Sequence, residues 1–433
     1  MIPTIIIASI TFVLVILSIL LFPHIKIGKV KIDTYWIIAL LGAIILLAFS
    51  FAPVKEVGNQ LINNSPMNPL KILVLFFSMT MISIIIDELG LFRYLASVAS
   101  RNAKGNQFVL FLVLYALTSV LTIFTSNDVV ILTMTPFICF FAKRSKINPI
   151  PYLVGEFVAA NTWSLMFVIG NPTNIYLATS SGITFVDYFK VMSIPTLVGG
   201  VFELILLLLI FHKPLKQPLM ENEMIYTIED KVPVIVGVVD LLICLTFLIV
   251  SNYLHLEMWY IAAICALSLL IFVLVYSIFK KKTFEHVVET LKRLPYQLIP
   301  FFLSMFVIVV GLKYQGINQH FADFLGNNNT IWVYGYTSFL TSNLINNIPM
   351  SILFTDLTSQ LLETEFLKGV YASIIGSNIG AFLTPIGALA GIMFSGLVND
   401  NNVRFTFIDF IKYGTIISIP VITVILGMLV LFI

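Results

Sequence analysis

Charged side chains are scarce in this sequence of 433 residues, because only 11% of them are Asp, Glu, Lys or Arg. A soluble domain carries about 25% charged residues, so the composition excludes an ordinary water-soluble protein. The 24 basic and 22 acidic residues nearly balance, which excludes a generally basic surface for nucleic acid. The nucleotide-binding pattern GxxxxGK(S/T) does not occur, so the chain itself is not expected to hydrolyse ATP.

Cysteine and histidine are also rare. Cys139, Cys244 and Cys265 lie far apart in separate apolar segments, as expected for small buried side chains rather than a disulfide or metal cluster. All five histidines fall at segment ends or in loops, which argues against a buried histidine–metal site. Neither HExxH nor GxSxG occurs, so we expect no enzyme and no cofactor other than a coupling ion.

Apolar residues, by contrast, make up 59% of the chain, and the mean hydropathy is +1.01. A membrane-spanning helix needs about 20 apolar residues. Uninterrupted spans are predicted at 4–22, 34–52, 70–92, 191–211, 233–251, 258–279, 294–313 and 413–432. Segments 151–180 and 369–395 are long enough but interrupted by Gly and Pro. The sequence therefore predicts an all-α polytopic membrane protein with about ten spans, the first a retained span rather than a secretion signal.

Two further apolar segments, 107–142 and 331–357, are too long for one span and short for two. Lysines and arginines flank the first on both sides, so it is predicted to enter and leave on the cytoplasmic side as a re-entrant helical hairpin, with its tip at TSND, 125–128. The flanks of the second carry little positive charge, and it is predicted to enter from outside, with its tip at TSNLINN, 341–347. The same reasoning uses Lys29, Lys104 and Lys282 as cytoplasmic residues. This orientation places both termini outside the cytoplasm. The protein is predicted to lie in the plasma membrane.

A charged stretch containing prolines, 213–232, is predicted to be a cytoplasmic linker between two halves. Residues 1–212 and 233–433 each contain, in order, three spans, a hairpin, an interrupted span and a final span. Five spans per half is an odd number, so the second half is predicted to be inverted relative to the first.

Local similarity supports this repeat independently. TSN recurs at 125–127 and 341–343, while GNPTN (170–174) and LTPIGA (383–388) interrupt corresponding spans. FVDYFK (185–190) likewise parallels FIDFIK (407–412). Three matches in the same order indicate an internal repeat.

Inverted repeats bring two hairpin tips and two broken helices together near the membrane midplane, where freed carbonyls can coordinate a cation and helix N-termini can face an anion. Ser, Thr and Asn add oxygen ligands and amide donors without permanent charge. The predicted substrate and ion site comprises Thr125, Ser126, Asn127, Asp128, Gly170, Asn171, Pro172, Thr173 and Asn174, with Thr341, Ser342, Asn343, Asn346, Asn347, Ser377, Asn378, Thr384, Pro385 and Gly387. In the alternative interpretation, the polar residues only hold helices together and the prolines only kink them.

Asp128 is the one carboxylate directly at a predicted tip, and Leu344 occupies the equivalent place in the second half. An intramembrane acid is a candidate proton carrier or cation ligand, so Asp128 is predicted to couple transport to an ion gradient. The alternative is a carboxylate that caps the tip by accepting backbone hydrogen bonds. Na⁺ would be held at Ser126, Asn127, Ser342 and Asn343. Asp87 and Glu88, beside Arg93, are expected to form an ion pair at the cytoplasmic interface.

These motifs resemble those of the ion transporter superfamily, which includes arsenite efflux permeases, sodium/dicarboxylate carriers and one class of sodium/proton antiporters. The resemblance covers essentially the whole chain. It is closest to arsenite permeases in IDELGLF (86–92), SNDVVILTMTP (126–136), VVGLKYQGI (309–317), NNIP (346–349) and YASIIGSNIGAFLTPIGALAGIMF (371–394). GNPTNI (170–175) is more similar to other branches. The dicarboxylate carriers have Ser-Asn-Thr at both tips, where this sequence has Asp128 and Leu344 after the Asn.

The resemblance implies a secondary transporter without a catalytic step that exports arsenite or antimonite. It further implies a homodimer in the lipid bilayer, an elevator-like movement of hairpins and broken helices, Na⁺ or H⁺ as coupling ion, and a separate ATPase subunit as a partner. Two alternatives remain within the superfamily, a Na⁺-coupled citrate or dicarboxylate symporter and a Na⁺/H⁺ antiporter. A channel that uses the paired hairpins as a pore is a third.

Overall fold

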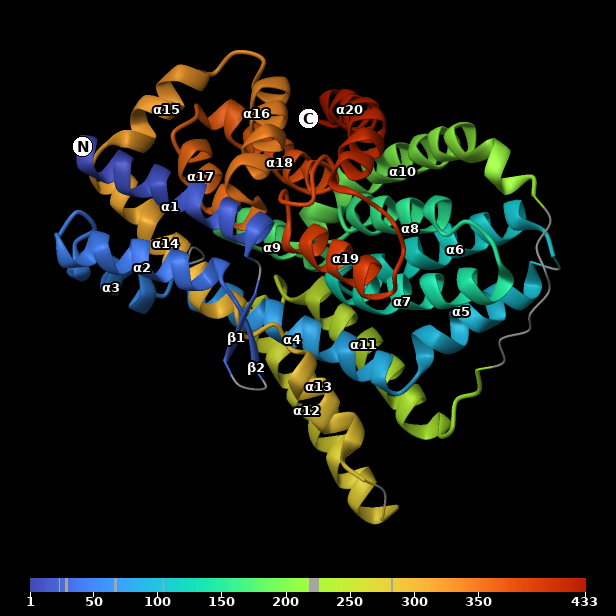
Figure 1. Ribbon diagram of the computed structural model, residues 1–433. Helices are drawn as coiled ribbons and strands as arrows, with labels where there is room; N and C mark the ends of the chain where they lie inside the picture. Colours follow the sequence, from blue (N-terminus) through green and yellow to red (C-terminus); the bar gives the residue numbers. More distant parts are fainter. Residues whose placement is uncertain (23, 28–29, 66–67, 104, 218–225, 282) are drawn as a thin grey trace.

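The computed structural model describes residues 1–22, 24–27, 30–65, 68–103, 105–217, 226–281 and 283–433 (Figure 1). Lys29, Lys104, Lys282 and the centre of the predicted linker, 218–225, lie outside the described residues. The described chain is helical apart from one antiparallel pair of strands, β1 (His24–Ile27) and β2 (Val30–Asp33), in which Ile25 faces Ile32. The all-α class is therefore confirmed, with a short β-hairpin that the sequence analysis did not expect.

The first three predicted spans are α1 (Ile2–Leu21), α2 (Tyr35–Ala48) and α4 (Pro69–Glu88), with the short helix α3 (Val54–Ile62) between the last two. The side chain of Asn68 accepts a hydrogen bond from the Leu70 N–H, and Pro69 follows it, which together fix the start of α4. Helix α5 (Leu91–Asn102) begins after Gly90, whose φ of 91° turns the chain away from α4.

The predicted first hairpin is α6 (Gln107–Phe124) and α7 (Asn127–Ser145). The predicted interrupted span is α8 (Ile150–Trp163), the 3₁₀ turn η1 (Val168–Gly170) and α9 (Pro172–Ser180). The long helix α10 (Phe185–Leu215) completes this half, and the Thr184 side chain caps its N-terminus by accepting from the Asp187 N–H.

The second half repeats this order of elements. Helices α11 (Lys231–Val250), α12 (Met258–Phe279), α13 (Glu285–Arg293), α14 (Leu298–Tyr314) and α15 (Ile317–Leu325) precede the hairpin α16 (Thr330–Ile345) and α17 (Asn347–Thr358). The interrupted span is α18 (Glu363–Gly380) and α19 (Leu389–Asp400), and α20 (Phe407–Phe432) is last. The inverted orientation of the halves 1–212 and 233–433 stays a prediction.

Within the described residues, eight segments are long and apolar enough to cross a membrane. They are Ile2–Ile19, Pro69–Glu88, Gln107–Phe124, Phe185–Leu215, Lys231–Val250, Met258–Phe279, Glu285–Tyr314 and Phe407–Phe432. All but Gln107–Phe124 coincide with predicted uninterrupted spans, and that segment is the first arm of the predicted hairpin. The remaining predicted span, 34–52, is α2, which has only 14 residues and ends at Ala48. The polytopic membrane architecture is confirmed.

Elements from the two halves pack against one another rather than forming two separate bodies. Helix α10 lies along α20, α2 packs on α14, and α4 packs on α12 (Figure 1). Around the hairpins, α6 packs on α8 and α16 packs closely on α18. Each hairpin therefore lies against the broken helix that follows it in the sequence, and this packing positions the candidate site.

Candidate functional site

The two broken helices meet through the side chain of Asn378, near the end of α18. Its Oδ1 accepts hydrogen bonds from Asn171 Nδ2 at 3.0 Å and Ser164 Oγ at 2.8 Å, and its Nδ2 donates to Asn174 Oδ1 at 2.5 Å. All four side chains are buried. Asn171 and Asn378 are 207 residues apart in the sequence, so the structure brings together the two breaks that the sequence analysis proposed as partners.

A second contact lies beside the first. Ser377 Oγ donates to Thr173 Oγ1 at 2.9 Å. The Asn171 side chain also caps α9, because its Oδ1 accepts from the backbone N–H of Thr173 at 3.1 Å and from its hydroxyl at 3.0 Å. Pro172 is the first residue of α9, where its missing N–H costs nothing. The capping geometry thus holds the amides of Asn171 and Asn174 toward α18.

Close backbone approach explains the glycines in the two breaks, 164–171 and 381–388. A Cβ on Gly170 would lie 2.3 Å from the Ser164 carbonyl oxygen, and a Cβ on Gly387 would lie 2.6 Å from that of Gly380. No side chain larger than hydrogen fits either position without moving the backbone. The second break also contains Thr384 and Pro385.

Two side-chain oxygens at the first hairpin tip form no hydrogen bond with another described residue. Helix α6 ends before Thr125, whose Oγ1 donates to the Leu121 carbonyl at 2.6 Å, and α7 starts after Ser126. Asn127 Nδ2 donates to Asn161 Oδ1 at 3.2 Å. Ser126 Oγ and Asn127 Oδ1 are buried and have no hydrogen-bond partner among the described residues. Buried polar atoms are normally satisfied, so these two oxygens are candidate ligands for a bound ion or solute.

Asp128, the next residue, lines a cavity of about 470 Å³ that also contains Asp33, Asp400 and Lys292. It is partly exposed. The α7 N-terminus has no side-chain cap, and Asp128 accepts no hydrogen bond from another described residue. The alternative interpretation of Asp128 as a tip-capping carboxylate is therefore wrong. Asp128 instead lines a mostly apolar cavity beside the first tip.

The second hairpin differs from its prediction, because the chain turns at Asn346 rather than at TSN. Helix α16 continues to Ile345, and Asn346 then adopts a φ of 75° with a ψ of 154°, a strained conformation outside the left-handed helical region. Its Oδ1 caps α17 by accepting from the Ile348 N–H at 3.3 Å. Matching the residues that start α7 and α17 pairs Asp128 with Ile348. The predicted equivalence of Asp128 and Leu344 is wrong, and Leu344 is 63% exposed.

The amides of the second hairpin bind the second break. Asn343 Nδ2 donates to the Gly380 carbonyl at 3.0 Å, and its Oδ1 accepts from Thr384 N at 3.1 Å and Thr384 Oγ1 at 2.7 Å. Asn346 Nδ2 donates to the Ile386 carbonyl, and Asn347 N donates to that of Gly387, both at 3.0 Å.

The two residues that precede Asn343 in the predicted TSN tip lie within α16. Ser342 Oγ donates to the Phe339 carbonyl of its own helix, and Thr341 is partly exposed. Of the four residues predicted to hold Na⁺, only Ser126 and Asn127 retain buried oxygens without a partner among the described residues.

Sequence reasoning missed two residues of this constellation, Asn161 and Ser164 at the end of α8. Asn161 receives the hydrogen bond from Asn127, and Ser164 bonds Asn378 through its hydroxyl and Asn174 through its carbonyl. The signal was three polar residues within NTWS (161–164), in a largely apolar segment five residues before GNPTN.

The predicted ion pair of Asp87 and Glu88 exists, but its partner is Arg293 of α13 rather than Arg93. Arg293 Nη1 lies 2.6 Å from Asp87 Oδ2 and also bonds Glu88 Oε1. Thr133 of α7 donates to the same Asp87 oxygen at 2.6 Å. This cluster joins α4 and α13 to the hairpin helix α7.

Comparison with protein families matches residues 12–368 to the citrate transporter family. The chain is 25% identical over 411 residues to an arsenical pump membrane protein of Escherichia coli, covering 91% of this chain and 92% of that protein. It is 27% identical over 371 residues to the arsenical pump membrane protein of strain K12, covering 82% and 85%.

Two further comparisons match most of the chain. A putative arsenical pump membrane protein of Bacillus subtilis strain 168 is 25% identical over 415 residues, covering 88% of this chain and 90% of that protein. The crystal structure of the YdaH transporter of Alcanivorax borkumensis, described as having an unusual topology, matches with a TM-score of 0.55 at 12% identity. That match covers 99% of this chain and 97% of the other, and shows a shared fold.

Proposed function

Because the chain belongs to the citrate transporter family, we propose that this secondary transporter exports arsenite or antimonite, binding the solute between the first hairpin tip and the joined helix breaks. The observation that carries the proposal is the buried set of amides and hydroxyls at Asn127, Asn171, Asn174 and Asn378. Two oxygens at the tip have no partner among the described residues, and the adjacent cavity holds a carboxylate. The relatives named arsenical pump membrane proteins support the choice of substrate.

The chemistry of these groups suits the substrate. Arsenous acid is an uncharged trihydroxy solute at neutral pH, so it needs hydrogen-bond donors and acceptors rather than a fixed charge. Amides and hydroxyls supply both, and the helix breaks add backbone groups that no helical partner satisfies. Asn171 and Asn174 are buried and already held in position. The solute can therefore exchange its water for protein groups with little loss of side-chain conformational entropy.

Asp128 is the proposed coupling group. It lines the cavity next to Ser126 and Asn127, so a proton or cation taken up by its carboxylate changes the charge beside the solute. The predicted inverted halves, an elevator-like movement, a homodimer in the plasma membrane and a separate ATPase subunit belong to the same proposal. The ATPase component would be recognised by ATP-dependent transport in vesicles that lack a proton gradient.

Everted membrane vesicles test the substrate directly. Vesicles containing the protein should accumulate arsenite when a proton gradient is imposed and should lose that accumulation when a protonophore is added. Vesicles containing Asn378→Leu should not accumulate it. Accumulation of citrate with no accumulation of arsenite would contradict the proposal.

A Na⁺-coupled carboxylate symporter is the second candidate. The observation that favours it is the pair of open oxygens, Ser126 Oγ and Asn127 Oδ1, since Na⁺ prefers uncharged oxygen ligands of this kind. Na⁺ should then raise the thermal unfolding temperature of the purified protein relative to K⁺, and Asn127→Ala should remove the difference. Equal unfolding temperatures in Na⁺ and K⁺ would count against this candidate.

A further inference from the structure

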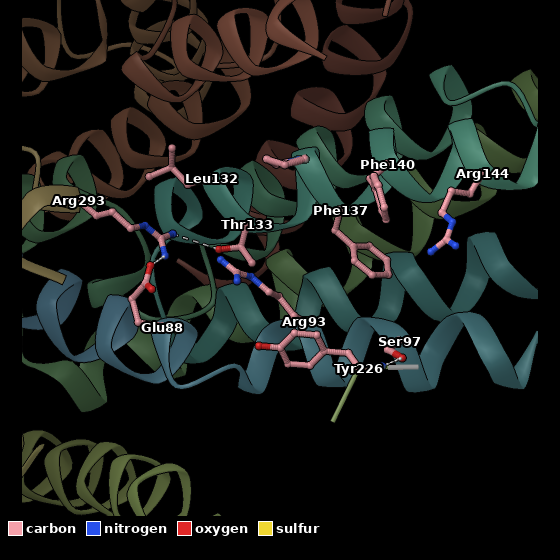
Figure 2. Close-up of a pocket in the computed structure, with 11 residues that line it drawn as sticks. Glu88, Arg93, Ser97, Leu132, Thr133, Phe137, Phe140, Arg144, Tyr226 and Arg293 are labelled. Atoms are coloured by element: carbon pink, nitrogen blue, oxygen red, sulfur yellow. Dashed lines mark hydrogen bonds and ion pairs between the residues drawn. The ribbon is translucent and has the colours of Figure 1, made fainter. Parts of the chain in front are cut away.

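A second cavity, of about 800 Å³, lies between α5 and α7 and shares Leu132 and Arg293 with the cavity that Asp128 lines. Three arginines line it, Arg93 from α5, Arg144 from α7 and Arg293 from α13. Figure 2 shows Arg93 and Arg293 directed toward the same space beside Thr133, with Arg144 farther along past Phe137 and Phe140. Its volume lies within the range of pockets that bind organic ligands.

The arginines are not equally neutralised. Arg293 bonds the carboxylates of Asp87 and Glu88, and its Nη2 lies 3.3 Å from Thr133 Oγ1. Arg93, in contrast, is exposed and forms no ion pair with another described residue. The three arginines that line the cavity outnumber the two carboxylates, Asp87 and Glu88, and the exposed guanidinium of Arg93 keeps N–H donors that no other described residue accepts. The ligand that complements it is an anion, and a guanidinium matches phosphate oxygens well.

The wall opposite Arg93 is apolar. Leu132, Pro136 and Phe140 follow one another at four-residue intervals along α7, with Phe137 beside them. Phe140 is 52% exposed, and the guanidinium carbon of Arg144 lies 5.6 Å from the centre of its ring. A cavity with a cationic group on one side and an exposed apolar strip on the other fits an amphiphile better than a small soluble anion.

The cavity also lies where such a ligand is available. The flanks of α6 and α7 carry Arg93, Arg101, Lys143, Arg144 and Lys146, which place this end of the protein on the predicted cytoplasmic side. Basic pockets between helices on that side of a membrane bind anionic lipid head groups.

We propose that this cavity binds the phosphate group of an anionic phospholipid, with Arg93 as the main contact and the Phe137–Phe140 strip beside the acyl chains. The bound lipid bridges α5 and α7. Since α7 begins with Asn127 and Asp128, the lipid restrains the helix that carries the first hairpin tip. Inorganic phosphate shares the same chemistry for Arg93 but lacks the apolar part.

Thermal unfolding of the full-length protein in neutral detergent tests this assignment. Short-chain phosphatidylglycerol, phosphatidylcholine of the same chain length and inorganic phosphate are titrated separately. Phosphatidylglycerol should raise the unfolding temperature, and Arg93→Gln should raise its half-maximal concentration about 10-fold, because a charge-assisted hydrogen bond is lost. Arg101→Gln, which removes the same charge from the same helix outside the cavity, should leave that concentration unchanged.

Two further variants keep the test decisive if Arg93→Gln does not fold. Arg93→Lys should retain part of the response, and Phe140→Ala should weaken the response to phosphatidylglycerol. Equal sensitivity of Arg93→Gln and Arg101→Gln would overturn the site. Equal responses to the two lipids, or a response to inorganic phosphate alone, would overturn the lipid assignment. Because every readout is binding, the result does not depend on which solute is transported.

Discussion

Hairpin α6–α7 leaves two buried oxygens at its tip without a partner among the described residues, whereas hairpin α16–α17 bonds its amides to the helix break beside it. The first hairpin also places a carboxylate in a cavity, and the second has Ile348 at the corresponding position. The two hairpins occupy the same position in their halves but use their polar groups differently. The second holds the site together, and the first has groups available for a ligand.

The side-chain amide of Asn378 joins the two broken helices. Its removal is expected to have the largest effect on stability and transport. Asn378→Leu keeps a similar side-chain volume but leaves Asn171 Nδ2 and Asn174 Oδ1 without their partner, while Ser164 Oγ keeps the Asn161 carbonyl. Each buried group left unsatisfied costs about 1–3 kcal/mol, so we expect loss of at least about 2 kcal/mol of stability and of all transport. Thermal unfolding and vesicle uptake measure the two effects. Asn401→Ala, which removes one local hydrogen bond near the end of α19, is the control and should change neither.

Removing one asparagine side chain from each hairpin separates stability from transport. Asn343→Ala loses the bonds to Gly380 and Thr384, so it should lower stability by about 2 kcal/mol or more. Asn127→Ala loses one bond of 3.2 Å and should change stability by less than about 1 kcal/mol, yet reduce uptake about 10-fold. Similar unfolding temperatures for the two variants would show that the hairpins do not differ in this way.

The carboxylate of the first hairpin is expected to affect coupling rather than folding. Asp128→Asn keeps the shape of a side chain that accepts no hydrogen bond from another described residue, so the unfolding temperature should change little. Uptake driven by a pH gradient should fall about 10-fold or more and become independent of external pH. The exposed Asp323, on α15, provides the matched control Asp323→Asn. An unchanged pH profile for Asp128→Asn would assign coupling to another group.

The smallest effect is expected from the thiol of the first hairpin. Cys139 is buried on α7, and the second hairpin contains no cysteine. Trivalent arsenic binds thiols, so Cys139 offers an alternative explanation of any difference between the hairpins. Cys139→Ala should leave arsenite uptake within about twofold, because the thiol lies away from the tip and packs as a small apolar group. A large loss of uptake with normal folding would move the substrate site toward this cysteine.

The sequence was most informative where proline, glycine and long apolar runs determine local structure. GNPTN and LTPIGA predicted both helix breaks, since a proline, a capping asparagine and glycines at close approaches are local requirements. The register of the second tip was not predictable from the repeated TSN, because the turn depends on the positive φ of Asn346 and on its bond to Ile386.

Contacts between distant segments were the other limit. Arg293 lies 206 residues from Asp87 in the sequence, whereas Arg93 lies close to it, so proximity in the chain indicated the wrong partner. Asn161 and Ser164 were missed for a similar reason, since only the folded chain places them against Asn127 and Asn378. Residue type predicted the chemistry of the site, and tertiary packing decided which residues share it.

The junction at Asn378 has a consequence for how the protein can move. Three side-chain hydrogen bonds from α8–α9 and their connecting break converge on one amide of α18, so the two broken helices resist separation. In the proposed transport cycle, the interface that yields would lie elsewhere, for example where Arg293 links α4 and α13 to α7. The height of the kinetic barrier between inward-open and outward-open states would be set at that interface and would depend on salt, whereas the affinity for the solute would not.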